Sequence, residues 1–107
     1  MAPLIKKAAD TNNLTDSERK HIPFITTQQD NNITTITVTC GDGIIHPMED
    51  DHWIIFIELF KNGKSVEKIT LKKTDEPKAV FTITDISNTD IITAHAFCNL
   101  HGIWESL

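Results

Sequence analysis

Five side chains of this sequence are of types that bind transition metals, and they fall in three short runs. His21 lies in the run KHIP, His46 and His52 lie in HPMEDDHWI, and Cys98 and His101 lie in CNLHG. Imidazole and thiolate groups are the ligands that borderline-soft transition metals prefer. Four imidazoles and one thiolate exceed the four ligands that a structural zinc ion normally takes. This donor set therefore indicates iron and redox chemistry.

The middle run has the character of a metal-binding loop that leads into a strand. His46 and His52 are spaced too irregularly for one helix face, but a loop can wrap both around an ion before a strand begins at Trp53. Pro47 stiffens such a loop because its ring fixes φ and favours an extended conformation at the residue before it. A single surface histidine is usually only solvated, so this run by itself does not establish a metal site.

The C-terminal run is a better signal. Cys98 and His101 can reach one ion from the end of a predicted strand, and Gly102 relaxes the turn that follows. If this run stood alone, a buried structural thiol beside a surface histidine would be the favoured interpretation, but that leaves the other two runs as coincidences. His95 belongs to none of the runs and shares its strand face with Phe97, so we interpret it as a non-ligand.

Beyond about residue 33 the chain has the pattern of short strands separated by turn residues. The expected strands are Thr35 to Cys40, Trp53 to Phe60, Val66 to Leu71, Lys78 to Thr84 and Ile91 to Cys98. The first alternates strictly between threonines and apolar residues, and an Asn-Gly pair after the second predicts a hairpin turn. Strands of this length and spacing predict an all-β fold, an immunoglobulin-like antiparallel β-sandwich.

Residues 1–107 are expected to form a single domain, since this length supports one hydrophobic core. Residues 1–20 are polar and poorly patterned, which predicts a short irregular N-terminal arm. The arm has at most one helical turn, near Thr15 to Lys20, where Thr15 and Glu18 resemble a capping box.

Composition and charge exclude several classes of protein. The formal net charge is −5 with no lysine- or arginine-rich stripe, which argues against a nucleic-acid partner. No apolar run is long enough to cross a bilayer, and the N-terminus lacks the apolar segment of a secretory signal. We therefore expect a cytoplasmic protein without membrane contact. Two cysteines are too few for a disulfide framework, and we do not expect a bridge between Cys40 and Cys98.

The three runs together resemble those of the superoxide reductases, specifically the one-iron form called neelaredoxin. The resemblance covers residues from about 17 to 105 and rests on KHIP, HPMEDDHWI and AFCNLHGIWE, in this order. It implies an immunoglobulin-like sandwich that holds one mononuclear iron on loops at one end, around residues 21, 46–52 and 98–102. The strand pattern predicts the same fold independently.

The resemblance also implies the role of each ligand. The histidines at positions 21, 46, 52 and 101 correspond to equatorial ligands and Cys98 to the axial one, with the sixth position left open. His101 would bind through Nδ1 and the others through Nε2. Main-chain N–H groups at residues 100 and 101 would temper the sulfur. Lys20 and Cys98 are the expected catalytic residues, because Lys20 adds a positive charge where an anion approaches and Cys98 favours electron donation.

The implied activity is the one-electron reduction of superoxide to hydrogen peroxide, with the iron re-reduced by an external electron donor such as rubredoxin. The chain lacks the four-cysteine iron module of the two-iron desulfoferrodoxins, so it depends on such a donor. Members of the family commonly form homodimers or homotetramers, and we expect one of these states here.

One position departs from the family pattern. The family usually places a glutamate directly before the Lys-His pair, where it can occupy the sixth iron position. In this chain Arg19 stands there and Glu18 lies one residue earlier. We therefore expect water or hydroxide, and not Glu18, in that role.

Two alternatives come from other classes of protein. A cupredoxin-like electron-transfer protein also combines a β-sandwich with a cysteine and histidines, but it needs a weak axial methionine after the last histidine, and Met48 follows the wrong one. The other alternative is a metal-free immunoglobulin-like interaction module whose histidines bind nothing.

Overall fold

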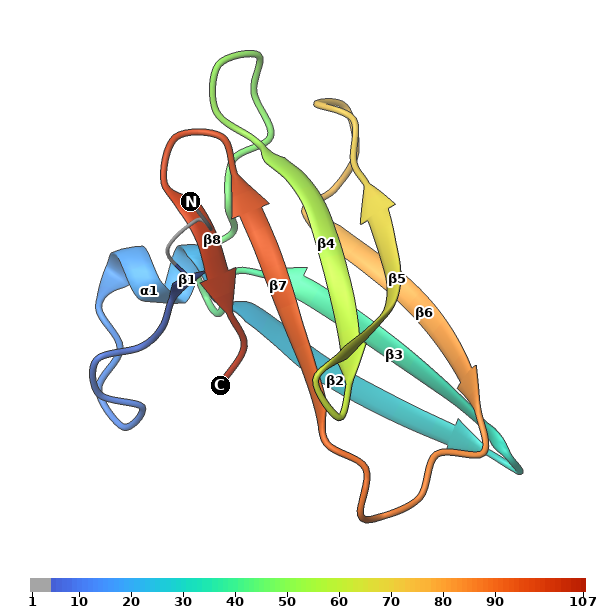
Figure 1. Ribbon diagram of the computed structural model, residues 1–107. Helices are drawn as coiled ribbons and strands as arrows, with labels where there is room; N and C mark the ends of the chain where they lie inside the picture. Colours follow the sequence, from blue (N-terminus) through green and yellow to red (C-terminus); the bar gives the residue numbers. More distant parts are fainter. Residues whose placement is uncertain (1–4) are drawn as a thin grey trace.

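Eight strands and one short helix make up residues 5–107, the part of the chain that the computed structural model describes (Figure 1). In chain order these elements are β1 (Ile5–Lys6), α1 (Asp16–His21), β2 (Pro23–Asp30), β3 (Ile33–Cys40), β4 (Ile54–Lys61), β5 (Lys64–Thr70), β6 (Lys78–Thr84), β7 (Ile92–Cys98) and β8 (Gly102–Glu105).

The strands form two sheets that face one another. One sheet has five strands in the order β1-β8-β7-β4-β5, and the other has three in the order β2-β3-β6. All neighbouring strands pair antiparallel except β1 and β8, which pair parallel. Figure 1 shows β4 and β7 lying across β2, β3 and β6. The predicted all-β sandwich is confirmed, with the parallel β1 pairing as an addition to it.

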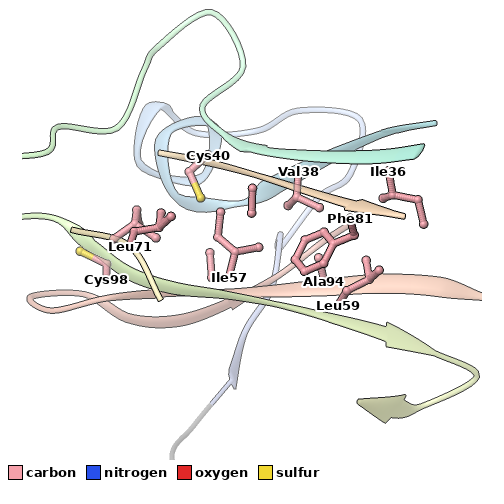
Figure 2. Close-up of a cluster of buried hydrophobic side chains, with 12 residues drawn as sticks. Ile36, Val38, Cys40, Ile57, Leu59, Leu71, Phe81, Ala94 and Cys98 are labelled. Atoms are coloured by element: carbon pink, nitrogen blue, oxygen red, sulfur yellow. The ribbon is translucent and has the colours of Figure 1, made fainter. Parts of the chain in front are cut away.

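The core lies between the two sheets and follows the alternation of the strands (Figure 2). On β3 the inward residues Ile36, Val38 and Cys40 are fully buried, as the threonine alternation predicts. They pack against inward residues of β4 and β7, and Cys98 lies at one end of this cluster. The last residue of β7 therefore belongs to the core.

Register brings the ligand-bearing loops to one end of the sandwich. Cys98, at the end of β7, pairs with Ile54 at the start of β4 and with Gly102 at the start of β8. In the other sheet, Pro23 at the start of β2 pairs with Cys40 at the end of β3. The three connections that carry the metal-ligand candidates all begin or finish at this end.

The predicted hairpin between β4 and β5 is confirmed. Asn62 and Gly63 both have positive φ, 53° and 81°, as a two-residue type I′ turn requires. Lys61 pairs with Lys64 across it, so the turn lies at the opposite end of β4 from the ligand-bearing loops.

Strands β1, β2 and β8 were not predicted. β2 is an edge strand and most of it is exposed, so its sequence carries no buried alternating face. β1 and β8 have only two and four residues and exist through pairing with one another and with β7. Long-range pairing of this kind leaves little local signal.

The predicted helical turn and its capping box are confirmed in α1. Thr15 is the N-cap, its hydroxyl accepts from the Glu18 N–H at 3.1 Å, and Glu18 Oε1 accepts from the Thr15 N–H at 2.8 Å. The second carboxylate oxygen accepts from the Ala9 N–H at 2.9 Å. Glu18 thus ties the arm to the helix that carries Lys20 and His21. No helix within residues 5–107 has the length and apolar character needed to cross a membrane.

Replacing Thr15 with alanine should lower the free energy of unfolding by about 0.5–2 kcal/mol, the usual cost of losing an N-cap. Urea unfolding of the metal-free protein measures this change. Thr11→Ala is the matched control, because Thr11 is exposed in the same arm, and it should change stability by less than about 0.5 kcal/mol. Equal effects of the two substitutions would contradict a specific role for the cap.

Candidate metal centre

All five candidate ligands meet at this end of the sandwich. His21 is the last residue of α1, Cys98 is the last residue of β7, and His101 lies in the turn between β7 and β8. His46 and His52 lie between β3 and β4. The ligand atoms of His21, His46, His52 and Cys98 all lie within 4.8 Å of one another. His101 joins them through Nδ1, which is 3.0 Å from His21 Nε2 and 3.6 Å from Cys98 Sγ.

The four imidazoles form a closed ring. Centroids of neighbouring rings are 4.8 Å apart for His21 and His46, 4.7 Å for His46 and His52, 5.1 Å for His52 and His101, and 4.6 Å for His101 and His21. The diagonal from His21 to His52 is longer, at 6.3 Å. Neighbouring planes are inclined by 67–76°. Four imidazoles arranged in this way could bind one ion together.

Two of the imidazoles have their tautomer fixed by the main chain. His21 Nδ1 donates to the Ser17 carbonyl at 2.8 Å, and His46 Nδ1 donates to the Pro47 carbonyl at 2.7 Å. A neutral imidazole with its proton on Nδ1 has a lone pair on Nε2. Hydrogen bonds to the outer nitrogen of this kind are how proteins orient histidine ligands.

The chemistry of the inward nitrogens fits a metal ion. His46 Nε2 and His52 Nε2 are buried and have no hydrogen-bond partner. A buried polar atom left without a partner costs about 1–3 kcal/mol. A bound cation would satisfy both lone pairs at once. The metal-free interaction module gives no reason for this cost, so the site disfavours that alternative.

Cys98 supplies sulfur to the same cluster from the core. Its side chain is fully buried, and its Sγ lies 3.6 Å from His101 Nδ1. Within residues 5–107 no main-chain N–H donates to this sulfur, and donation from residues 100 and 101 to a metal-bound sulfur stays a prediction.

Desolvation favours the neutral form of three of the imidazoles. Desolvation is the largest cause that lowers the pKa of His21, His46 and His101, and it lowers the pKa of His46 to about 4. The positive charge of Lys20 lowers all three pKa values further. His21 and His46 are 2% and 1% exposed, whereas His101 is exposed and marks the open side of the cluster. Neutral imidazole is the form that binds metal.

Asn99 joins two of the loops that carry candidate ligands, a role that no sequence pattern predicted. Its Oδ1 accepts from the Trp53 N–H at 2.9 Å and its Nδ2 donates to the Asp51 carbonyl at 3.0 Å. Its main-chain N–H donates to the Trp53 carbonyl at 3.2 Å. These bonds hold the segment around His52 against the turn that follows Cys98.

Arg19 and Glu18 serve the structure around the cluster. Arg19 Nε donates to the Asp42 carbonyl at 3.0 Å, and the Arg19 carbonyl accepts from the Asp42 N–H at 2.8 Å. Both oxygens of Glu18 accept main-chain hydrogen bonds. These lower the pKa of its carboxyl group, and the bond from Thr15 has a larger effect than the bond from Ala9. Glu18 could ligate an ion only by weakening its bond to Thr15 or to Ala9.

Three other side chains lie outside the cluster. His95 Nε2 is 3.1 Å from Glu105 Oε1, in agreement with its interpretation as a non-ligand. Cys40 is a free, buried thiol, and burial raises its pKa to about 12. Met48 Sδ accepts from the Ile54 N–H at 3.5 Å and packs against the core. It cannot act as the weak axial ligand that a cupredoxin needs.

Comparison with known proteins gives a consistent result. The family model for desulfoferrodoxin matches residues 13–107. The desulfoferrodoxin homolog of Archaeoglobus fulgidus is 37% identical over 85% of this chain, and the desulfoferrodoxin of Nitratidesulfovibrio vulgaris is 39% identical over 84%. The chain spans 65% and 64% of the lengths of these two relatives.

Among solved structures, the superoxide reductase from Nanoarchaeum equitans superposes with a TM-score of 0.78 and 25% identity. The match covers 96% of each chain. The two-sheet fold is therefore shared over nearly the whole chain.

Metal-free protein should become less stable as the pH falls from about 6.5 to about 4. The folded-state pKa of His46 is lowered to about 4, so in this window the unfolded chain binds more protons than the folded one. The contribution is fully present above the unfolded pKa and is lost as the pH falls towards the folded pKa. Thermal unfolding in the presence of a chelator, from pH 7.5 to 4.5, measures this slope, which should be shallower in His46→Gln. Identical slopes in both proteins would contradict the attribution of this pH dependence to His46.

Proposed function

The chain belongs to the desulfoferrodoxin family, and from this premise we propose that it is a superoxide reductase acting at a mononuclear iron site. The observation that carries the proposal is the ring of four imidazoles beside one cysteine sulfur, with two buried Nε2 atoms that lack any partner. Ferrous iron bound there would supply one electron. We propose that residues 1–107 act as one domain in this reaction.

The proposed ligands are His21, His46, His52, His101 and Cys98. The fixed tautomers of His21 and His46 support coordination through Nε2, and the short approach of His101 Nδ1 to the sulfur supports coordination through Nδ1. Five donors exceed the tetrahedral set of a structural zinc ion. Nitrogen ligands from imidazole with one thiolate suit a redox-active iron.

Lys20 is the proposed residue for substrate approach. It is the residue before His21, and its positive charge lowers the pKa of His21, His46 and His101. Superoxide carries one negative charge, and the chain as a whole repels it with a net charge of −5. At physiological salt, the repulsion from exposed charges more than about 8 Å away is largely screened. A nearby lysine therefore dominates the local field.

The reaction balances with one electron and two protons. Superoxide takes up one electron and two protons and leaves as hydrogen peroxide, and no dioxygen is formed. The exposed side of His101 offers water access from which protons can be drawn. The engaged carboxylate of Glu18 supports water or hydroxide, and not glutamate, at the remaining position.

The proposed reaction needs a source of electrons. We propose an external donor such as rubredoxin, because residues 5–107 contain one cluster of metal-ligand candidates and the two cysteines are one ligand and one core thiol. We further propose a homodimer or homotetramer. Phe24, Ile25 and the exposed Leu107 line a surface hollow and are candidates for contact between subunits. Two free thiols support a reducing compartment, the cytoplasm.

Replacing Cys98 with serine should alter the low-temperature electron paramagnetic resonance spectrum of the oxidised, iron-loaded protein. The unchanged protein should give a low-field, high-spin ferric signal, and loss of the thiolate should change its shape. Cys40→Ser is the matched control and should leave the signal in place, because Cys40 lies in the core. Copper hyperfine lines, or a signal that is indifferent to the Cys98 change, would contradict the proposal.

Replacing Lys20 with glutamine should slow the second-order reaction with superoxide by about two- to tenfold at low ionic strength. Electrostatic focusing by a whole protein raises association rates by roughly 10–1,000-fold, and a single lysine supplies only part of this increase. Pulse radiolysis over a salt series measures the effect, and the salt dependence should weaken in the variant. Lys64→Gln makes the same change of charge at the far hairpin and should preserve the rate. An unchanged rate and salt dependence in Lys20→Gln would remove this role.

A further inference from the structure

Trp104, on β8, contacts two of the proposed ligands although it is not a ligand itself. Its indole ring stacks on the His21 imidazole with centroids 5.1 Å apart and planes inclined by 16°. Its Nε1–H donates to the His101 carbonyl at 3.2 Å. The side chain is buried, with 8% of the residue exposed. One residue therefore links ligands that are 80 positions apart in the chain.

These two contacts supply restraints that the rest of the cluster lacks. His21 Nδ1 contacts the Ser17 carbonyl at 2.8 Å and the Ser17 hydroxyl at 3.4 Å, which directs the inward nitrogen. Contacts at this one ring atom still leave the imidazole plane free to tilt. A stacked indole restricts the tilt. His101 is exposed, so its position depends on the turn that carries it, and the indole N–H holds that turn.

The N-terminal strand covers the same indole. Lys6 of β1 pairs with Trp104 of β8, and the Lys6 ammonium lies 5.5 Å from the centroid of the indole ring. A cation over an indole face is attracted by the ring quadrupole. Pairing with β1 thus fixes the main chain of Trp104, while the Lys6 ammonium and the His21 imidazole contact its indole ring.

We infer that Trp104 is a positioning residue that orients His21 and the His101 turn before a metal ion binds. The inference rests on the proposed metal site and is independent of the substrate. Residues that orient metal ligands typically change metal affinity by about 10–100-fold when they are removed. A residue that only fills space would change the stability of the metal-free fold and leave the metal environment unaltered.

The other tryptophan provides a matched comparison. Trp53 directly follows the proposed ligand His52, but its ring lies under the Lys73 ammonium at 4.6 Å, and its main chain bonds to Asn99. Within residues 5–107 it stacks on no imidazole of the cluster. The chain has two tryptophans, so each can be replaced separately while the other stays.

The test is binding of Co²⁺ to metal-free protein, followed by the visible absorption bands of the bound ion and by competition with a chelator. Trp104→Leu removes both contacts and should weaken binding by about 10–100-fold with shifted bands. Trp104→Phe keeps a ring against His21 and loses the N–H donor, so its loss should be smaller. Trp53→Phe should bind within about twofold of the unchanged protein. Thermal unfolding of each metal-free variant accompanies the titrations.

Each outcome bears on a separate claim. Unaltered affinity and bands in Trp104→Leu, or an equal loss in Trp53→Phe and Trp104→Phe, would overturn the positioning role. If Trp104→Leu does not fold, Trp104→Phe decides: weaker binding at an unchanged unfolding temperature supports the role, and unchanged binding overturns it. If the unchanged protein binds no Co²⁺, the proposed metal site itself fails, whatever the variants do.

Discussion

The structure depends on keeping buried imidazole nitrogens aimed at a common point with no protein partner of their own. Several interactions around the site fix the outer nitrogen of a ring or hold the loop that carries it. Main-chain carbonyls of Ser17 and Pro47 take the outer protons of His21 and His46. Asn99 holds two loops together, and Trp104 holds two ligands. The buried lone pairs of His46 and His52 destabilise the metal-free fold, and a bound cation would offset this cost.

Local chemistry explains why this constraint can be met by so small a domain. The capping box fixes the start of α1 through local hydrogen bonds. Register aligns the ends of β4 and β7 in one sheet and of β2 and β3 in the other, and core packing brings the two sheets together at this end. Arg19, beside Lys20 and His21, binds the main chain at Asp42 through its side chain and its carbonyl. It thereby stabilises the loop leading to His46.

Sequence patterns predicted those parts whose cause is local. Alternation in β3, the Asn-Gly turn after β4 and the Thr15–Glu18 capping box each follow from neighbouring residues. The donor types of the five ligand candidates were visible in the same way. Strand β2 was missed because it is an edge strand with most of its residues exposed. β1 and β8 were missed because they are short and their pairing with one another joins distant segments. Asn99 and Trp104 were missed for the same reason, since their partners lie in other loops.

The approach of His21 to His101 also sets an order of assembly. These residues are 80 positions apart and their nitrogens lie 3.0 Å apart. Closing a loop of this length costs conformational entropy, and contacts of such high sequence separation form late in folding. A growing chain that has emerged only as far as His52 holds three of the imidazoles but neither the sulfur nor the fourth. The complete donor set arises only once β8 has joined its sheet, which makes metal capture a property of the finished fold.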